Sequence, residues 1–242
     1  MMAVTEGLSL SQKLHEALGN LIARTEPGER LPSEPKLARD LGVSRATLRE
    51  AMRTFETQGL ISRRQGVGTF VLRPSNVLDT GLEVLESIET LAERIGLQVS
   101  LGALEKVRRE AIKQEVEALG LQPGDCVIDI SRVIRAEDHP VAFLVDILPE
   151  NVISMQDMGE GFNGSVLDLL LQRGTPPLRN SRCEIKAEAA SSEVARFLNI
   201  QRGVSLLCFN SVLFAEDGRA IDYSTSYFLP GYFRFHVLRE VA

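Results

Sequence analysis

The stretch from Leu31 to Val71 reads LPSEPKLARDLGVSRATLREAMRTFETQGLISRRQGVGTFV. It holds two short segments with helical periodicity, a three-residue turn between them and a glycine-tipped hairpin. Ser33 and Ser44 stand where N-cap residues are preferred, and Gly42 stands where the first helix has to end. This order of elements predicts a winged helix-turn-helix domain.

The second predicted helix has one apolar face and one cationic face. Its inward positions are Leu48, Ala51, Met52 and Phe55. Arg45, Arg49 and Arg53 recur every fourth residue, so each is rotated by about 40° from the last and all three share the outer face. A helix with such a face can lie in the major groove of DNA.

A hairpin follows, with strands predicted at 61–64 and 69–71 and a thin tip around Gly66 that can approach phosphates or enter the minor groove. Arg63 and Arg64 flank this tip and are candidate DNA contacts. The alternative is an amphipathic helical hairpin whose arginines only face water. That alternative explains neither the short turn between two capped helices nor the glycine hairpin.

These motifs resemble the N-terminal domain of the GntR family of bacterial transcription regulators. The resemblance implies operator binding as a dimer, with DNA contacts from the start of the second helix and from the wing around Gly66. The residues concerned at the helix start are Ser44, Arg45, Thr47 and Arg49. Many relatives carry an arginine directly after the glutamate of LPSE, where it contacts the DNA backbone. This chain has Pro35 at that position, followed by Lys36. Lys36 is therefore the candidate phosphate contact.

Charge is divided unevenly along the chain. Residues 1–73 carry 11 Lys and Arg against 8 Asp and Glu, a net +3, whereas residues 74–242 carry 16 against 25, a net −9. Only the first part attracts nucleic acid. The overall charge of −6 disfavours a protein that coats DNA regardless of sequence, because such binding depends on neutralising many phosphates.

Several other classes of protein are disfavoured. No stretch approaches the roughly 18 to 20 apolar residues of a membrane span, and the start MMAVTEGLSL lacks a basic segment followed by an apolar one, so a cytoplasmic protein is expected. Cys126, Cys183 and Cys208 have no CxxC spacing and offer no metal framework. The GxG at residues 66–68 opens no helix, so no dinucleotide site and no cofactor are predicted.

The chain divides into two domains. A helix predicted over 8–25 begins the DNA-binding domain, which extends over residues 1–73. A polar joint with Pro74 covers 74–80. A helix from about 81 to 95, with apolar residues at helical spacing, then opens a second domain over 81–242.

The second domain contains an internal repeat. Residues 118–138 and 197–217, which lie 79 positions apart, agree at seven of 21 positions. Each copy reads as a short helix, a turn with glycine, a long alternating strand, an AED turn and a returning strand. Two such units predict an α+β domain with one antiparallel sheet, and a further helix is expected between them at about 165–172.

Alternation in the first long strand marks one position as a candidate ligand contact. Arg132 shares a face with Ile128, Ile130 and Ile134, and a guanidinium there is costly unless it is paired. Either an internal carboxylate or a bound anion can meet it, and both alternatives stay open. The equivalent position in the second copy is Ser211, which favours a role beyond architecture.

Three further residues are candidates in this domain. Ser165 stands at a helix start, where it can bind an anion or act only as an N-cap. Tyr223 and Tyr227 share one strand face and are either core or pocket-lining.

This half resembles the UTRA effector domain of the HutC branch of GntR regulators, which shares its fold with chorismate lyase. The matching stretches are RVIRAEDHPVAF, GSVLDLL and SYFLPGYFRFHVLR. The resemblance implies dimerisation and binding of a small metabolite, often a sugar phosphate, by Arg132, Ser165 and Tyr227. Two family residues are replaced, an arginine by Ile134 and a glutamate by Leu144, although Asp146 on the same face could substitute for the second. A singly charged acid or a polar metabolite is therefore expected instead.

The sequence thus predicts a transcription regulator that binds an inverted-repeat operator as a homodimer under the control of a small anionic or polar effector. An enzyme is the alternative from another class, since the second domain resembles a lyase. His15, His139 and His236 stand in separate elements without a paired acid and base, which disfavours it. An architectural DNA-bending protein is disfavoured by the acidic second domain.

Overall fold

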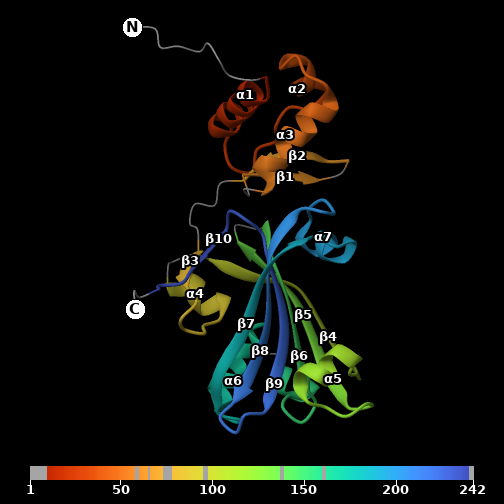
Figure 1. Ribbon diagram of the computed structural model, residues 1–242, viewed down its shortest axis with the longest axis vertical. Helices are drawn as coiled ribbons and strands as arrows, with labels where there is room; N and C mark the ends of the chain where they lie inside the picture. The colour runs from red at the N-terminus through yellow and green to blue at the C-terminus, as the bar shows by residue number, and fades with distance from the viewer. Residues whose placement is uncertain are drawn as a thin grey trace.

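The computed structural model describes residues 10–57, 60–64, 66–72, 78–94, 98–136, 139–159 and 162–239. Its N-terminal part packs three helices on a two-stranded sheet (Figure 1). These elements are α1 (Leu10–Arg24), α2 (Glu34–Asp40), α3 (Arg45–Thr57), β1 (Ile61–Arg64) and β2 (Gly68–Val71). The helix-turn-helix and the antiparallel wing predicted from the sequence are confirmed.

The core of this domain follows the predicted helical faces. Leu48, Met52 and Phe55 of α3 are buried against α1 and α2, while Ala51 is partly buried. Gly42 has a φ of +66° directly after α2, a conformation that favours glycine. The expected cap at Ser33 is half right, because its carbonyl accepts from the backbone N–H of Leu37 at 2.9 Å but its side chain makes no capping bond.

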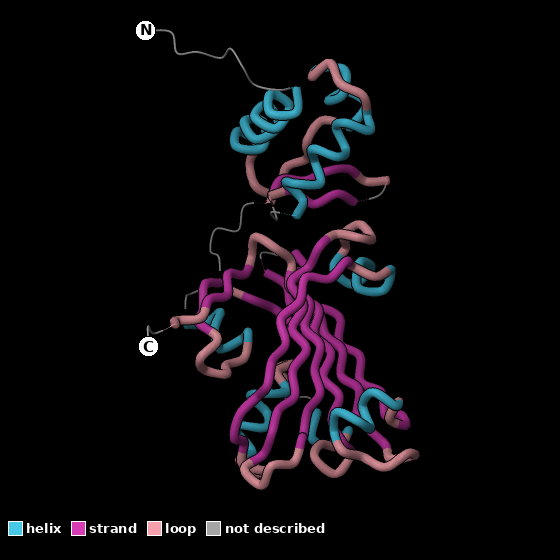
Figure 2. Tube along the Cα trace, in the orientation of Figure 1, coloured by secondary structure: helices cyan, strands magenta, loops and turns pink. Residues whose placement is uncertain are grey.

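The C-terminal part is built on a six-stranded antiparallel sheet with the order β4-β5-β6-β9-β8-β7 (Figure 2). Its strands are β4 (Val99–Glu110), β5 (Cys126–Ala136), β6 (His139–Pro149), β7 (Leu178–Ala189), β8 (Ser205–Ala215) and β9 (Ala220–Phe228). The α+β class and the antiparallel sheet expected from the repeat are confirmed.

Short helices cover both faces of this sheet. They are α4 (Ile88–Arg94), α5 (Lys113–Leu119), α6 (Val166–Arg173) and α7 (Ser192–Leu198), with a 3₁₀ turn, η1, at Met155–Met158. Leu170 of α6 packs with Ile130, whereas Leu119 of α5 packs with Val127. Because neighbouring residues of a strand point to opposite faces, α6 and α5 lie on different sides of the sheet. No helix within the described residues is long and apolar enough to cross a membrane.

The internal repeat is larger than the sequence indicated. Shifting the bounds of β4, α5 and β5 by 79 residues gives the bounds of β7, α7 and β8. The same shift takes α4 onto α6 and β6 onto β9 to within two residues at each end. The sheet therefore consists of two copies of one unit, which meet where β6 pairs with β9.

The start of the second domain differs from the prediction. Gly81, expected to begin a helix, instead ends the strand β3 (Leu78–Gly81), which pairs in parallel with β10 (Phe233–His236). The helix α4 starts only at Ile88, where Ser87 Oγ accepts from Thr90 N at 2.9 Å. The distant strand β10 supplies backbone partners that a local pattern cannot reveal. Residues 74–77 of the predicted joint and residue 95 of the predicted helix lie outside the described residues.

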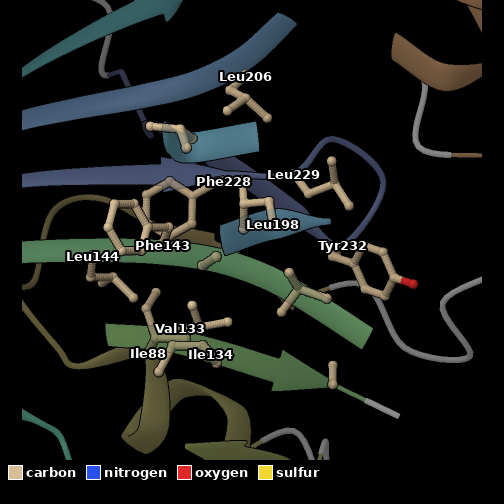
Figure 3. Packing of buried hydrophobic residues seen from close by; sticks show 14 of the residues in the cluster. Ile88, Val133, Ile134, Phe143, Leu144, Leu198, Leu206, Phe228, Leu229 and Tyr232 are labelled. Carbon is tan, nitrogen blue, oxygen red and sulfur yellow. The ribbon is translucent and has the colours of Figure 1, made fainter. Parts of the chain in front are cut away.

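The largest apolar cluster lies where α4, α7 and the ends of the central strands meet (Figure 3). Phe143 of β6 stacks on Phe197 of α7 with ring centroids 4.4 Å apart. Ile88 of α4 and Ile134 of β5 pack into the same cluster from the other side of the sheet. This packing fixes α4 against β5 and so positions the polar residues described next.

Candidate functional site

The start of α3 presents the residues that sequence patterns assign to DNA contact. Ser44 Oγ accepts a hydrogen bond from Thr47 N at 3.0 Å, which confirms the predicted N-cap. It also shares a hydrogen bond of 2.8 Å with Thr47 Oγ1. Ser44, Arg45 and Thr47 are all exposed, so the first turn of this helix is open to a partner.

Arg49 and Arg53 extend the exposed cationic face by two turns. Arg49 Nε lies 2.6 Å from Glu34 Oε2 and keeps 56% of its side chain exposed, while Arg53 pairs with Glu50 at 3.5 Å. Exposed ion pairs of this kind contribute little to stability, so phosphates or base edges can replace them. Lys36 is exposed on the neighbouring helix α2.

Arg63 is not at the surface, contrary to its predicted role beside the wing tip. Its side chain is buried, and its Nε donates to Glu56 Oε2 at 2.8 Å. Its Nη1 lies 3.9 Å from Glu34. Burial raises the pKa of Glu56, and the charge and hydrogen bonds of Arg63 oppose that rise. Arg63 is therefore a structural residue that joins α3 to β1, and it leaves the set of candidate DNA contacts.

Gly66 and Arg64 are the other wing residues that were expected to contact DNA. Gly66 is exposed at the tip with a φ of +75°, a conformation that disfavours any residue with a side chain. The Arg64 guanidinium lies over the ring of Phe70, 4.9 Å from its centroid, and its Nε is buried without a hydrogen-bond partner. Arg64 is thus held against the wing sheet.

Arg132 lies among the predicted apolar residues and is 5% exposed. Its Nη1 forms an ion pair with Asp146, and its Nε lies 3.8 Å from Glu89 Oε1. Of the two alternatives left open by the sequence, the internal carboxylate is therefore the one that the structure contains. Asp146, expected to contact a ligand, is the main partner of Arg132.

A third carboxylate, Asp222, joins this group from β9, and sequence reasoning missed it. Strand register places Asp222 two residues from Ser224, which is the partner of Asp146, so Asp222 and Asp146 share a face. Asp222 is 6% exposed, and its Oδ1 has no hydrogen-bond partner. Burial and the charge of Asp146 raise the pKa of Asp222 well above its ordinary value. The alternation of side chains along β9 could have indicated that Asp222 points to the same face as Ser224 and Ser226.

A cavity of about 530 Å³ adjoins this cluster through Glu89. The residues that line it come from α4, β4, β5 and the segment before α6. They are Glu89, Glu93, Gln98, Val99, Ser100, Leu101, Ile134 and Asn163. Both carboxylate oxygens of Glu89 are buried without a hydrogen-bond partner, and burial raises the pKa of this group.

Ser165 lies beside this cavity but caps a helix. It is fully buried, its Oγ accepts from Asp168 N at 3.1 Å, and its backbone N donates to Asn163 Oδ1 at 3.0 Å. Asp168 in turn accepts a hydrogen bond from Ser87 Oγ at 2.8 Å. The structure thus shows the N-cap role of Ser165, whose backbone bond orients the cavity residue Asn163.

Tyr223 and Tyr227 do not share the site of Arg132. Tyr227 pairs in register with Phe143, whereas Arg132 pairs with Leu144, so the two side chains point to opposite faces of the sheet. Tyr223 packs in the apolar cluster under α5. Of the two alternatives left open by the sequence, core or pocket-lining, the structure packs Tyr227 and Tyr223 against apolar clusters, on the face of the sheet opposite to Arg132.

A winged helix-turn-helix joined to a sheet domain with a polar cavity defines the class of ligand-responsive DNA-binding regulators. Comparison with known families agrees with this class. Residues 10–71 match the model described as bacterial regulatory proteins, gntR family, and residues 94–234 match the UTRA domain. The chain belongs to the GntR family, carries a UTRA domain and is a transcriptional regulator.

Individual relatives support this assignment over most of the chain. The probable transcriptional regulator PhnF of Escherichia coli is 30% identical over 82% of both chains. The HTH-type transcriptional repressor NagR of Bacillus subtilis is 26% identical over 83% of this chain and 82% of its own. The crystal structure of PhnF from Mycobacterium smegmatis has the same fold, with a TM-score of 0.62, 21% identity and coverage of 95% of this chain and 100% of that one.

Proposed function

We propose that this regulator is a homodimer that binds an inverted-repeat operator, and that a small polar metabolite in the Glu89 cavity changes its affinity for DNA. The observation that carries the proposal is the exposed N-terminal half of α3, where Arg45, Thr47 and Arg49 face outward on a helix whose other side is buried. Such a helix can present its N-terminal side chains to base edges in the major groove.

The DNA contacts fall into two groups. Arg45 and Arg49 are proposed to read base edges, because arginine can form paired hydrogen bonds with guanine. Ser44, Thr47 and Lys36 are proposed to contact phosphates together with the wing around Gly66, which fixes the register on the duplex. Arg64 can add charge near the wing.

Dimerisation follows from the geometry of DNA reading. Two recognition helices have to meet grooves about one turn, or about 34 Å, apart, so a two-fold protein favours a short inverted repeat. The edge strand β7 offers one surface for pairing, because it ends the sheet and pairs only with β8 among the described strands. An exposed strand edge readily pairs with a second chain.

The effector needs no contact with DNA. A coupling of about 1 to 3 kcal/mol between cavity and operator would change operator affinity roughly 5- to 150-fold. Repression is the proposed sense of control, since NagR and the histidine utilization repressor of Pseudomonas putida are repressors by name. Catalysis is not proposed: His15 stacks on Phe55 in the N-terminal domain, far along the chain from His139 and His236.

Footprinting on DNA upstream of the genes that adjoin the regulator's own gene tests this function. A protected palindrome of two half-sites, with the protein eluting as a dimer, is the expected result. Failure to protect any palindrome at moderate salt, with correctly folded protein, would overturn the proposal.

A further inference from the structure

The surroundings of the Glu89 cavity carry an excess of negative charge. Glu89 and Glu93 line it, and Asp146 and Asp168 are close enough to Glu89 to raise its pKa. Among the described residues that line the cavity there is no lysine or arginine. A phosphate or carboxylate placed here would meet carboxylates before it met a cation.

The guanidinium of Arg132 does not reverse this balance. It is buried and already forms an ion pair with Asp146, so an anionic ligand would have to displace a carboxylate that is itself 8% exposed. Breaking a buried ion pair leaves an uncompensated charge, which is strongly unfavourable. Ile134, an apolar side chain, lines the cavity on the same strand.

Buried polar atoms without partners point to a missing ligand group. Both Glu89 oxygens are buried and accept no hydrogen bond, although one of them lies 3.8 Å from Arg132 Nε. Arg132 Nε and Asp222 Oδ1 also lack partners, on side chains that are 5% and 6% exposed. Buried polar groups are almost always satisfied, and the unpartnered oxygens of Glu89, which borders the cavity, are acceptors that a ligand donor would satisfy.

We infer that the effector carries a positively charged nitrogen, a primary amine or a guanidine, which donates hydrogen bonds to Glu89 at the base of the cavity. This inference rests on the proposed function, because it names the ligand of the same regulatory site. Glu93 at the rim adds attraction for the same charge, and Gln98, Ser100 and Asn163 can bind hydroxyl or carbonyl groups.

The shape of the cavity limits the rest of the molecule. Its volume of about 530 Å³ suits a small metabolite, and Val99, Leu101 and Ile134 form an apolar wall. An amine or guanidine on a short aliphatic or sugar framework fits this combination. The ligand thus differs in charge from the anionic or polar effector that was expected from the sequence.

Thermal-shift measurements on the full chain test the inference with probes of matched size. The probes are agmatine, putrescine and glucosamine as cations, glucose as a neutral compound, and glucose 6-phosphate and pentanoate as anions, each at about 10 mM. We expect at least one cation to raise the melting temperature and the anions to leave it unchanged. A shift by an anion, or no shift by any of the cations, would overturn the inference.

Variants locate the effect. Glu89→Gln should weaken binding of the active cation at least about tenfold, as judged by titration calorimetry, and Glu93→Gln should weaken it less. Glu105→Gln, which removes the same charge from an exposed position of β4, is the matched control and should bind normally. Equal binding by Glu89→Gln and wild type would contradict the site.

Operator binding separates this inference from the proposed function. The ligand-free protein should protect its operator whatever the charge of the effector. If the protein protects its operator normally but binds an anion, only the inference of a cationic effector is contradicted. If the protein does not protect the operator, the proposed function itself is contradicted.

Discussion

Arg63 Nε donates a 2.8 Å hydrogen bond to Glu56 Oε2, and both side chains are buried, at 5% and 4% exposure. The Arg63 backbone N–H donates to the other oxygen of the same carboxylate at 3.2 Å. This contact ties the last turns of α3 to the first strand of the wing. A buried ion pair therefore joins α3 and the wing, the two elements proposed to contact DNA.

Replacement of Arg63 should damage folding before it affects DNA recognition. Arg63→Ala leaves Glu56 buried without its partner, which costs about 3 to 5 kcal/mol of unfolding free energy. Urea unfolding of the variant measures this loss, and Arg53→Ala, at an exposed position of α3, is the control. An Arg63→Ala protein of normal stability that no longer binds DNA would return Arg63 to the DNA interface.

Arg45 and Arg49 should behave in the opposite way. Arg45→Ala and Arg49→Ala each remove a proposed base contact and should cost about 1 to 3 kcal/mol of binding to the operator but little binding to unrelated DNA. Their stability should stay near wild type, because both side chains are exposed. Competition between operator and scrambled duplexes measures the loss, with Arg24→Ala as a control. A loss of folding would contradict the groove assignment.

Lys36 should contribute affinity without sequence preference. Lys36→Ala removes one phosphate contact, so it should weaken binding to all duplexes alike and reduce the slope of log K against log salt by about one. Titrations at several salt concentrations check this. A change in base preference would show that Lys36 reads bases instead.

Local patterns predicted the elements of the N-terminal domain because each signal lies close to its effect. The cap at Ser44, the stop at Gly42 and the apolar face of α3 act within a few residues, and the structure contains all three. Arg63 was misplaced because its partner Glu56 lies in the preceding helix. The position of Arg63 beside the glycine tip does not show whether its side chain points to the buried or the exposed face of the strand.

For the second domain, the sequence predicted the class of fold but neither the strand order nor the side chains that meet across the sheet, because these depend on residues far apart in the sequence. The 79-residue repeat revealed two hairpins, but the order β4-β5-β6-β9-β8-β7 depends on pairings between distant strands. Tyr227 was grouped with Arg132 although the register across β6 separates them, and Asp222 was overlooked. Side chains that meet across a sheet cannot be paired from one strand at a time.

Loss of Arg132 should destabilise the effector domain. Arg132→Met keeps most of the volume but leaves Asp146 buried without its cation, which costs about 3 to 5 kcal/mol. Heat unfolding of the variant measures the cost, with Arg108→Met, at an exposed ion pair on the neighbouring strand β4, as a control. If stability is unchanged and only the ligand response disappears, Arg132 contacts the effector directly.

Asp222 should make the stability of the protein depend on pH. Its folded pKa is raised by burial and by Asp146, so the native state holds a proton that the unfolded chain releases above its ordinary pKa of 3.8. The stabilisation that this proton provides is complete below pH 3.8 and is lost progressively as the pH rises from there through the raised pKa of the folded state.

Asp222→Asn removes this proton while keeping a donor that can face Asp146. The variant should be more stable than wild type at pH 8, and the difference should shrink as the pH falls toward the ordinary pKa of an aspartate. Urea unfolding at pH 5 and pH 8 measures both effects. Asp217→Asn is the control, because Asp217 is exposed and its backbone and side-chain bonds to Arg219 lower its pKa. If Asp222→Asn is less stable than wild type at pH 8, then Asp222 is ionised there and belongs to the charge balance of Arg132.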